Sequence, residues 1–235
     1  MQEKCTFKLS LFLAAALVAL FTTSEAQTVA KKKAEITTTE RQEFGSRGTI
    51  YIVDSFGEIR VEGWDQQEVE VTVKRTTQKE YEPKNIAKAV KDLQRVKIEM
   101  ELVSESTMLI IKTTFPPRTP TRMLRGKSNA NLEYTIKVPR HSKLVINHDI
   151  GEVTVANVDG DMEVTNRIGE ISLKLPQENQ YTIDAKAKIG DVSSEFGEPT
   201  SRQKLLGAKL ESDPPPTARR LFLRVGIGEI QVSKM

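Results

Sequence analysis

A unit in which an acidic residue and then an apolar residue follow a glycine occurs six times, and these carboxylates are the side chains of this sequence best placed to do chemistry. The acids are Glu58, Glu152, Asp161, Glu170, Asp191 and Glu229, after Gly57, Gly151, Gly160, Gly169, Gly190 and Gly228. Calcium takes about six to eight oxygen ligands. Most of these units offer a single acid, and the Gly-Gly-x-Gly-x-Asp pattern of calcium-binding coils is absent from the sequence. We expect the acids to keep turns soluble and to oppose wrong edge pairing.

Paired carboxylates also cleave glycans when they are held about 5 to 9.5 Å apart beside a sugar groove. Neighbouring strands lie only about 4.8 Å apart, and acids in pairs occur on regular surfaces without any active site. These points favour a protein that is not an enzyme. The alternatives are a carbohydrate-active enzyme on a β-coil scaffold and a calcium-stabilised surface protein.

The sequence holds no stronger catalytic pattern. His141 and His148 are seven residues apart on strand-like sequence and are expected on opposite faces. The stretch RGKS at 125–128 resembles the end of a phosphate loop, but Thr121 stands where that loop needs a glycine. The only cysteine, Cys5, lies in the leader described below. We predict no catalytic residue, no metal ligand and no cofactor.

Basic residues gather in one segment without apolar periodicity, the loop 116–130. The net charge of +3 is too small to favour nucleic acid as a partner. We predict that this loop contacts a partner, an envelope glycan or protein, through Arg118, Arg122, Arg125 and Lys127.

The first 26 residues have the pattern of a signal peptide. A basic start with Lys4 and Lys8 precedes an apolar run from Leu9 to Phe21, and the small residues of a cleavage site follow at 24–26. The chain is therefore expected to be exported, to a periplasm, a cell envelope or the medium. No transmembrane segment is expected in the mature chain, and residues 27–43 are predicted to be a flexible lead-in.

Residues 44–235 are predicted to form a single all-β domain. Apolar residues alternate with polar ones in short runs such as 50–52, 59–61 and 69–73, which is typical of half-buried strands. Helical spacing appears in one place, where an insert near 84–95 is predicted to be a short helix.

The glycine units predict how these strands are arranged. Residues two and four after a glycine share one strand face. Most units also keep an apolar residue before the glycine, which predicts a bend that returns both sets to one interior. The predicted interior residues are Ile150, Val153, Val155, Ile168, Ile171, Leu173, Ile189, Val192, Ile227, Ile230 and Val232.

Glycines 18 and 21 residues apart, at 151, 169 and 190, fit successive rungs of a flattened coil. We therefore predict a solenoid-like stack of short strands, similar to a right-handed β-helix, with these three units as neighbours. An antiparallel β-sandwich built from the same units is the alternative.

Two stretches resemble a known family. GEIRVEGWD at 57–65, followed by VEVTVKR, and the run from Leu132 to Val164 resemble an exported bacterial family of unknown function, the adhesin-like domains. Members of that family repeat a Gly-acid-Ile/Val-x-Val unit in a β-solenoid-like stack. The resemblance implies an envelope or secreted protein. We therefore expect a non-enzymatic binding or structural module that contacts a cell-envelope partner, with its oligomeric state open.

Overall fold

A computed structural model describes residues 30–45, 47–103, 107–116, 130–176, 181–196, 200–204, 207–211 and 218–235. The side chains of Ser55 and of residues 200–204 are not described. The predicted signal peptide lies outside the described residues. Most of the described chain is strand, with one helix, which confirms the prediction of an all-β fold.

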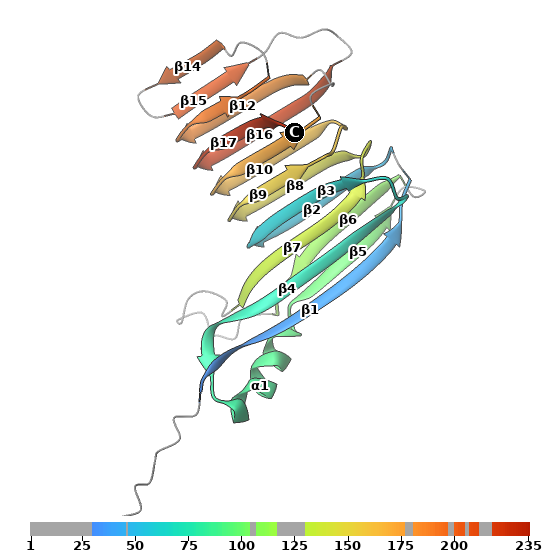
Figure 1. The fold of residues 1–235 in the computed structure, drawn as a ribbon, viewed down its shortest axis with the longest axis vertical. Coiled ribbons are helices and arrows are strands. Elements are labelled where there is room, and N and C mark those ends of the chain that lie inside the picture. Colours follow the sequence, from blue (N-terminus) through green and yellow to red (C-terminus); the bar gives the residue numbers. More distant parts are fainter. Residues whose placement is uncertain are drawn as a thin grey trace, which may run out of the picture. The chain divides into compact units, whose positions relative to one another are not determined.

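The strands form two mixed sheets (Figure 1). The first sheet runs in the order β1 (Lys32–Glu43), β4 (Glu68–Tyr81), β7 (Ala130–Pro139), β3 (Glu58–Trp64), β9 (Val153–Ala156), β11 (Ile171–Leu175), β17 (Ile230–Lys234), β13 (Val192–Ser194). The second runs β14 (Thr200–Lys204), β15 (Gly207–Glu211), β12 (Tyr181–Ile189), β16 (Arg219–Ile227), β10 (Met162–Ile168), β8 (Lys143–Ile150), β2 (Thr49–Phe56), β6 (Met108–Thr114), β5 (Lys97–Val103).

The centre of both sheets is built from a repeated unit that we call a rung. A rung is one strand of the second sheet, a bend at a glycine, and one strand of the first sheet, as in β8 and β9 around Gly151. Strands of neighbouring rungs pair in parallel within each sheet. Like positions of the repeat therefore lie side by side.

The spatial order of the rungs corrects the sequence prediction. The bends follow one another as Gly57, Gly151, Gly169, Gly228 and Gly190. The C-terminal rung thus lies between the two rungs that we expected to be neighbours. The hairpin β14–β15 occupies one edge of β12. On its other edge β12 pairs with β16, and β16 in turn pairs with β10.

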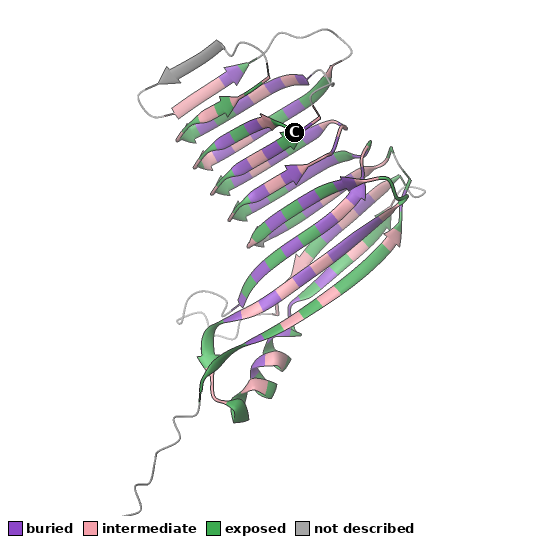
Figure 2. Cartoon of the chain, in the orientation of Figure 1, coloured by how far each residue is buried: buried purple, intermediate pink, exposed green. Residues whose placement is uncertain are grey.

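One hydrophobic core contains residues from both sheets. The buried and exposed residues alternate along the central strands (Figure 2), as a period of two requires. The predicted interior residues after each glycine are confirmed as buried in three rungs: Val153, Val155, Ile171, Leu173, Ile230 and Val232. Val192, in the last rung, is partly buried and packs against the core.

The predicted burial of the apolar residues before the glycines is wrong. The exposed fractions are 44% for Ile150, 38% for Ile168, 49% for Ile227 and 50% for Ile189. These residues continue the inward-facing alternation of their strands, but the chain reverses at the glycine that follows. The reversal leaves them at the rim of the bend instead of between the sheets.

The predicted flexible lead-in also differs from the structure, because β1 occupies most of it. This edge strand pairs antiparallel with β4 along its length and places Ala34 in the core. An edge strand with one solvated face needs few apolar residues, which explains why its lysine- and threonine-rich sequence resembles a loop.

The helix predicted near 84–95 lies at Pro83–Leu93 as α1. Its proline stands in the first turn, where a missing N–H costs no hydrogen bond. Ala89 and Leu93 are buried as α1 packs against β1 and β4.

Candidate functional site

The bends of the five rungs form one continuous edge, which we call the glycine edge. The five glycines there have φ between +124° and +138°, a region that L-residues with a side chain avoid. They also stack backbone on backbone: a Cβ on Gly169 would lie 1.9 Å from the carbonyl oxygen of Gly151. Gly160 does not belong to this edge, because it precedes β10 at the opposite end of the rung, beside Ser142.

Two rows of side chains follow the glycine edge. The isoleucine row consists of the residues directly before the glycines: Ile150, Ile168, Ile227 and Ile189. The carboxylate row consists of the exposed acids directly after them: Glu58, Glu152, Glu170, Glu229 and Asp191. Because the strands pair in parallel, the backbones of neighbouring members of each row lie about 4.8 Å apart, the spacing of adjacent strands. The acids of the repeat are thus brought together, except Asp161, which lies at the other edge.

Buried polar side chains support the bends from inside, three residues before the glycine. Asn166 is 1% exposed and donates from Nδ2 to the carbonyl oxygen of Gly151 at 2.7 Å. His148 occupies the paired position on the next rung, and its Nε2 donates to the carbonyl oxygen of Gly57 at 3.1 Å. The sequence analysis missed this row, although polar residues recur three positions before Gly57, Gly151 and Gly169.

Burial lowers the pKa of His148 below its ordinary value. The unfolded ring protonates near pH 6.5, so stability is complete above that pH and falls as the pH drops toward the folded pKa. One proton contributes at most about 1.4 kcal/mol per pH unit to this slope. We expect His148→Asn to remove the contribution of the ring below pH 6.5, because Asn166 makes the same bond on the next rung. Urea unfolding at several pH values measures it.

The control is Asn147→Ser, at the exposed neighbouring position of the same strand, which changes no titratable group and should keep the wild-type dependence. Because carboxylates also titrate at low pH, the relevant quantity is the difference between variant and wild type. Equal slopes for wild type and His148→Asn would show that the buried ring does not carry the effect.

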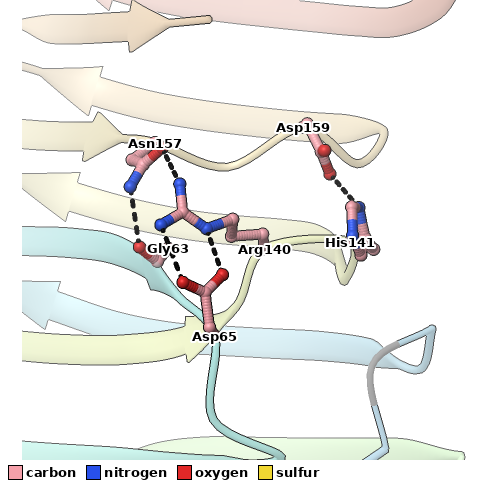
Figure 3. Close-up of polar contacts among 6 residues, drawn as sticks. All are labelled: Gly63, Asp65, Arg140, His141, Asn157 and Asp159. Atoms are coloured by element: carbon pink, nitrogen blue, oxygen red, sulfur yellow. Dashed lines mark hydrogen bonds and ion pairs between the residues drawn. The ribbon is translucent and has the colours of Figure 1, made fainter.

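The opposite edge carries a network of polar contacts between the ends of β3, β7 and β9 (Figure 3). Arg140 donates from Nε to Asp65 at 2.6 Å and also to the side-chain oxygen of Asn157. Asn157, with φ of +58°, donates to the carbonyl oxygen of Gly63 at 3.1 Å. The bond to Arg140 lowers the pKa of the fully exposed Asp65 carboxyl. These contacts fasten successive bends together.

A histidine and an aspartate meet at the same edge. Nδ1 of His141 lies 2.6 Å from Oδ1 of Asp159 (Figure 3). Ser142, the next residue, is wholly buried, so its hydroxyl cannot reach a substrate. Ser142 therefore does not provide the accessible nucleophile that acyl transfer needs. His141 lies in a turn, whereas His148 is buried.

A groove of about 700 Å³ crosses the outer face of the second sheet near the glycine edge. It crosses five parallel strands, β2, β8, β10, β16 and β12. Its cationic residues are Arg167, Arg224, Lys186 and Lys188, and the carboxylates of Asp54 and Asp149 also line it. Arg224 is held by Asp184 at 2.7 Å. No pattern in the sequence predicts this groove, because Arg224 reaches it only through the insertion of β16 between β10 and β12.

The predicted contact residues Arg118, Arg122, Arg125 and Lys127 lie outside the described residues. Within the described part of the chain, no group of three or more His, Cys, Asp or Glu side chains is placed to hold a metal ion. None of the described helices is long and apolar enough to span a membrane.

Comparisons with known proteins add a fold likeness. No family model and no curated protein matches the chain. A solved candidate cell adhesion protein of Clostridium sporogenes ATCC 15579 is similar with a TM-score of 0.50 and 11% identity, covering 87% of this chain and 100% of that one. A candidate adhesin of Bacteroides fragilis NCTC 9343 matches at a TM-score of 0.30 and 10% identity, over 84% and 97% of the two chains. The first match shows a likeness of fold alone, and nothing is argued from the second.

Proposed function

We propose that this protein is an exported, non-enzymatic module that binds a component of the cell envelope, a glycan or a protein. The observation that carries the proposal is the stack of parallel rungs with its extended, regular β surface, because stacked repeats of this kind form extended binding surfaces. The fold likeness to the Clostridium protein agrees with an adhesin-like role.

The stacked architecture supports this proposal. Parallel ladders in both sheets favour the solenoid-like stack over the antiparallel sandwich. Such stacks present rows of identical side chains at a fixed spacing, which suits the recognition of extended partners. The signal peptide predicted at residues 1–26 supports export. We propose that residues 44–235, together with β1, form one domain.

Sedimentation with isolated envelope material tests the proposal. The secreted form, residues 27–235, is mixed with envelope fractions, and the bound amount is measured as protein and salt concentrations are raised. We expect saturable binding that persists at high salt, because screening removes only long-range attraction between exposed charges. Binding that disappears with salt, or that never saturates, would contradict a specific partner.

We also propose that the basic loop 116–130 adds to this binding. Replacing its four basic residues by serine should weaken envelope binding. The control is a variant in which the net charge changes by the same amount outside the loop. In it, four exposed lysines become serine: Lys79, Lys88, Lys91 and Lys97. Equal loss in both variants would mean that net charge, and not the loop, attracts the envelope.

A further inference from the structure

We propose that two copies of this chain pair side by side along the glycine edge, with their isoleucine rows in contact. Four large apolar side chains lie on adjacent rungs of this edge and are 38% to 50% exposed. Single exposed apolar residues are ordinary on protein surfaces. An unbroken row on neighbouring strands is different, because each side chain extends the apolar surface of the one before it.

The two sides of the isoleucine row carry opposite charge. The carboxylate row lies on the side toward the first sheet. The cationic groove lies on the other side, on the outer face of the second sheet. In the groove, Arg167 is near Asp149, with Nε 3.4 Å from Oδ1, whereas Lys186 and Lys188 make no ion pair with any described residue.

This arrangement is complementary to itself under one kind of symmetry. A twofold axis parallel to the isoleucine row places the carboxylate side of each copy against the cationic side of the other. A twofold axis perpendicular to the row, in the plane of contact, would place like charges together. Closed twofold pairs use one self-complementary patch on both copies, and opposite charge fixes the register of such a contact.

The middle of the row shows where a partner carboxylate fits. Gly226 leaves the groove without a side chain between Arg167 and Lys188, and a Cβ there would lie 2.4 Å from the carbonyl oxygen of Arg167. Glu229 belongs to the same rung as Gly226. In the parallel arrangement, Glu229 of each copy therefore enters the hollow of the other, between two cationic side chains.

Sedimentation equilibrium of the secreted form over a range of concentrations tests the pairing. We expect a reversible monomer–dimer equilibrium, and we expect Ile168→Ser with Ile227→Ser to lower the association constant by about tenfold or more. Leu102→Ser is the control, since Leu102 is 37% exposed on β5, away from the row. A monomer at every concentration, or a dimer insensitive to the isoleucine changes, would overturn the proposal.

A charge exchange tests the symmetry. Glu229→Lys and Lys188→Glu should each weaken self-association, because each places like charges in contact. Mixing the two variants should restore pairing, since every groove then faces an opposite charge. A mixture that associates no better than either variant would contradict the parallel arrangement. This test needs no envelope material, so the pairing can stand or fail independently of the proposed function.

Discussion

Gly169→Ala should lower the free energy of unfolding by about 3 kcal/mol or more. Gly169 has φ of +135°, where an alanine side chain is strained. The added Cβ would also lie 1.9 Å from the carbonyl oxygen of Gly151, on the neighbouring rung. Relief would require two stacked backbones to separate and would break the hydrogen bond from Gly151 N–H to the carbonyl of Ile168. Chemical unfolding, followed by circular dichroism, measures the loss.

Gly45→Ala provides the matched control for this change. A Cβ at Gly45 meets no atom within 4 Å. Alanine there should leave stability nearly unchanged or raise it by up to about 1 kcal/mol, because it restricts the unfolded chain. Similar losses at both positions would show that the stacking of the bends does not limit stability.

Ile171→Asp should prevent folding, whereas Ile168→Asp should leave the chain folded. Ile171 is wholly buried, between the sheets. Replacing it removes about 1.5 to 3 kcal/mol of apolar burial and places a carboxylate without a partner in the core, which costs several kcal/mol more. Ile168 lies in the same rung but is 38% exposed, so an aspartate there stays in water.

The soluble yield and the thermal transition of the two variants separate these expectations. Because both changes introduce the same charge three residues apart, differences in net charge cannot explain a different outcome. A folded Ile171→Asp protein with wild-type thermal behaviour would contradict the burial of this face.

The apolar residues before the glycines show a limit of local patterns. Most repeat units keep one, and this recurrence predicts burial, although the structure leaves these residues partly exposed. The alternation of apolar and polar residues does point these side chains inward. It does not show whether a strand of the other sheet lies opposite them. At a sharp bend, a residue can follow the inward alternation and still meet solvent, as Ile227 does at 49% exposure.

The sequence by itself determined most of the strands, the helix α1, the bends at glycine and the buried residues that follow most of these bends. These features depend on local spacing and on the backbone freedom of glycine, both of which can be read along one segment. Tertiary structure alone decided that the rung of Gly228 inserts before that of Gly190, that β1 is an edge strand, and that isoleucines, carboxylates and a cationic groove share one edge. Those outcomes depend on which distant strands pair. Because the glycine units are similar, more than one order of pairing is compatible with the local sequence.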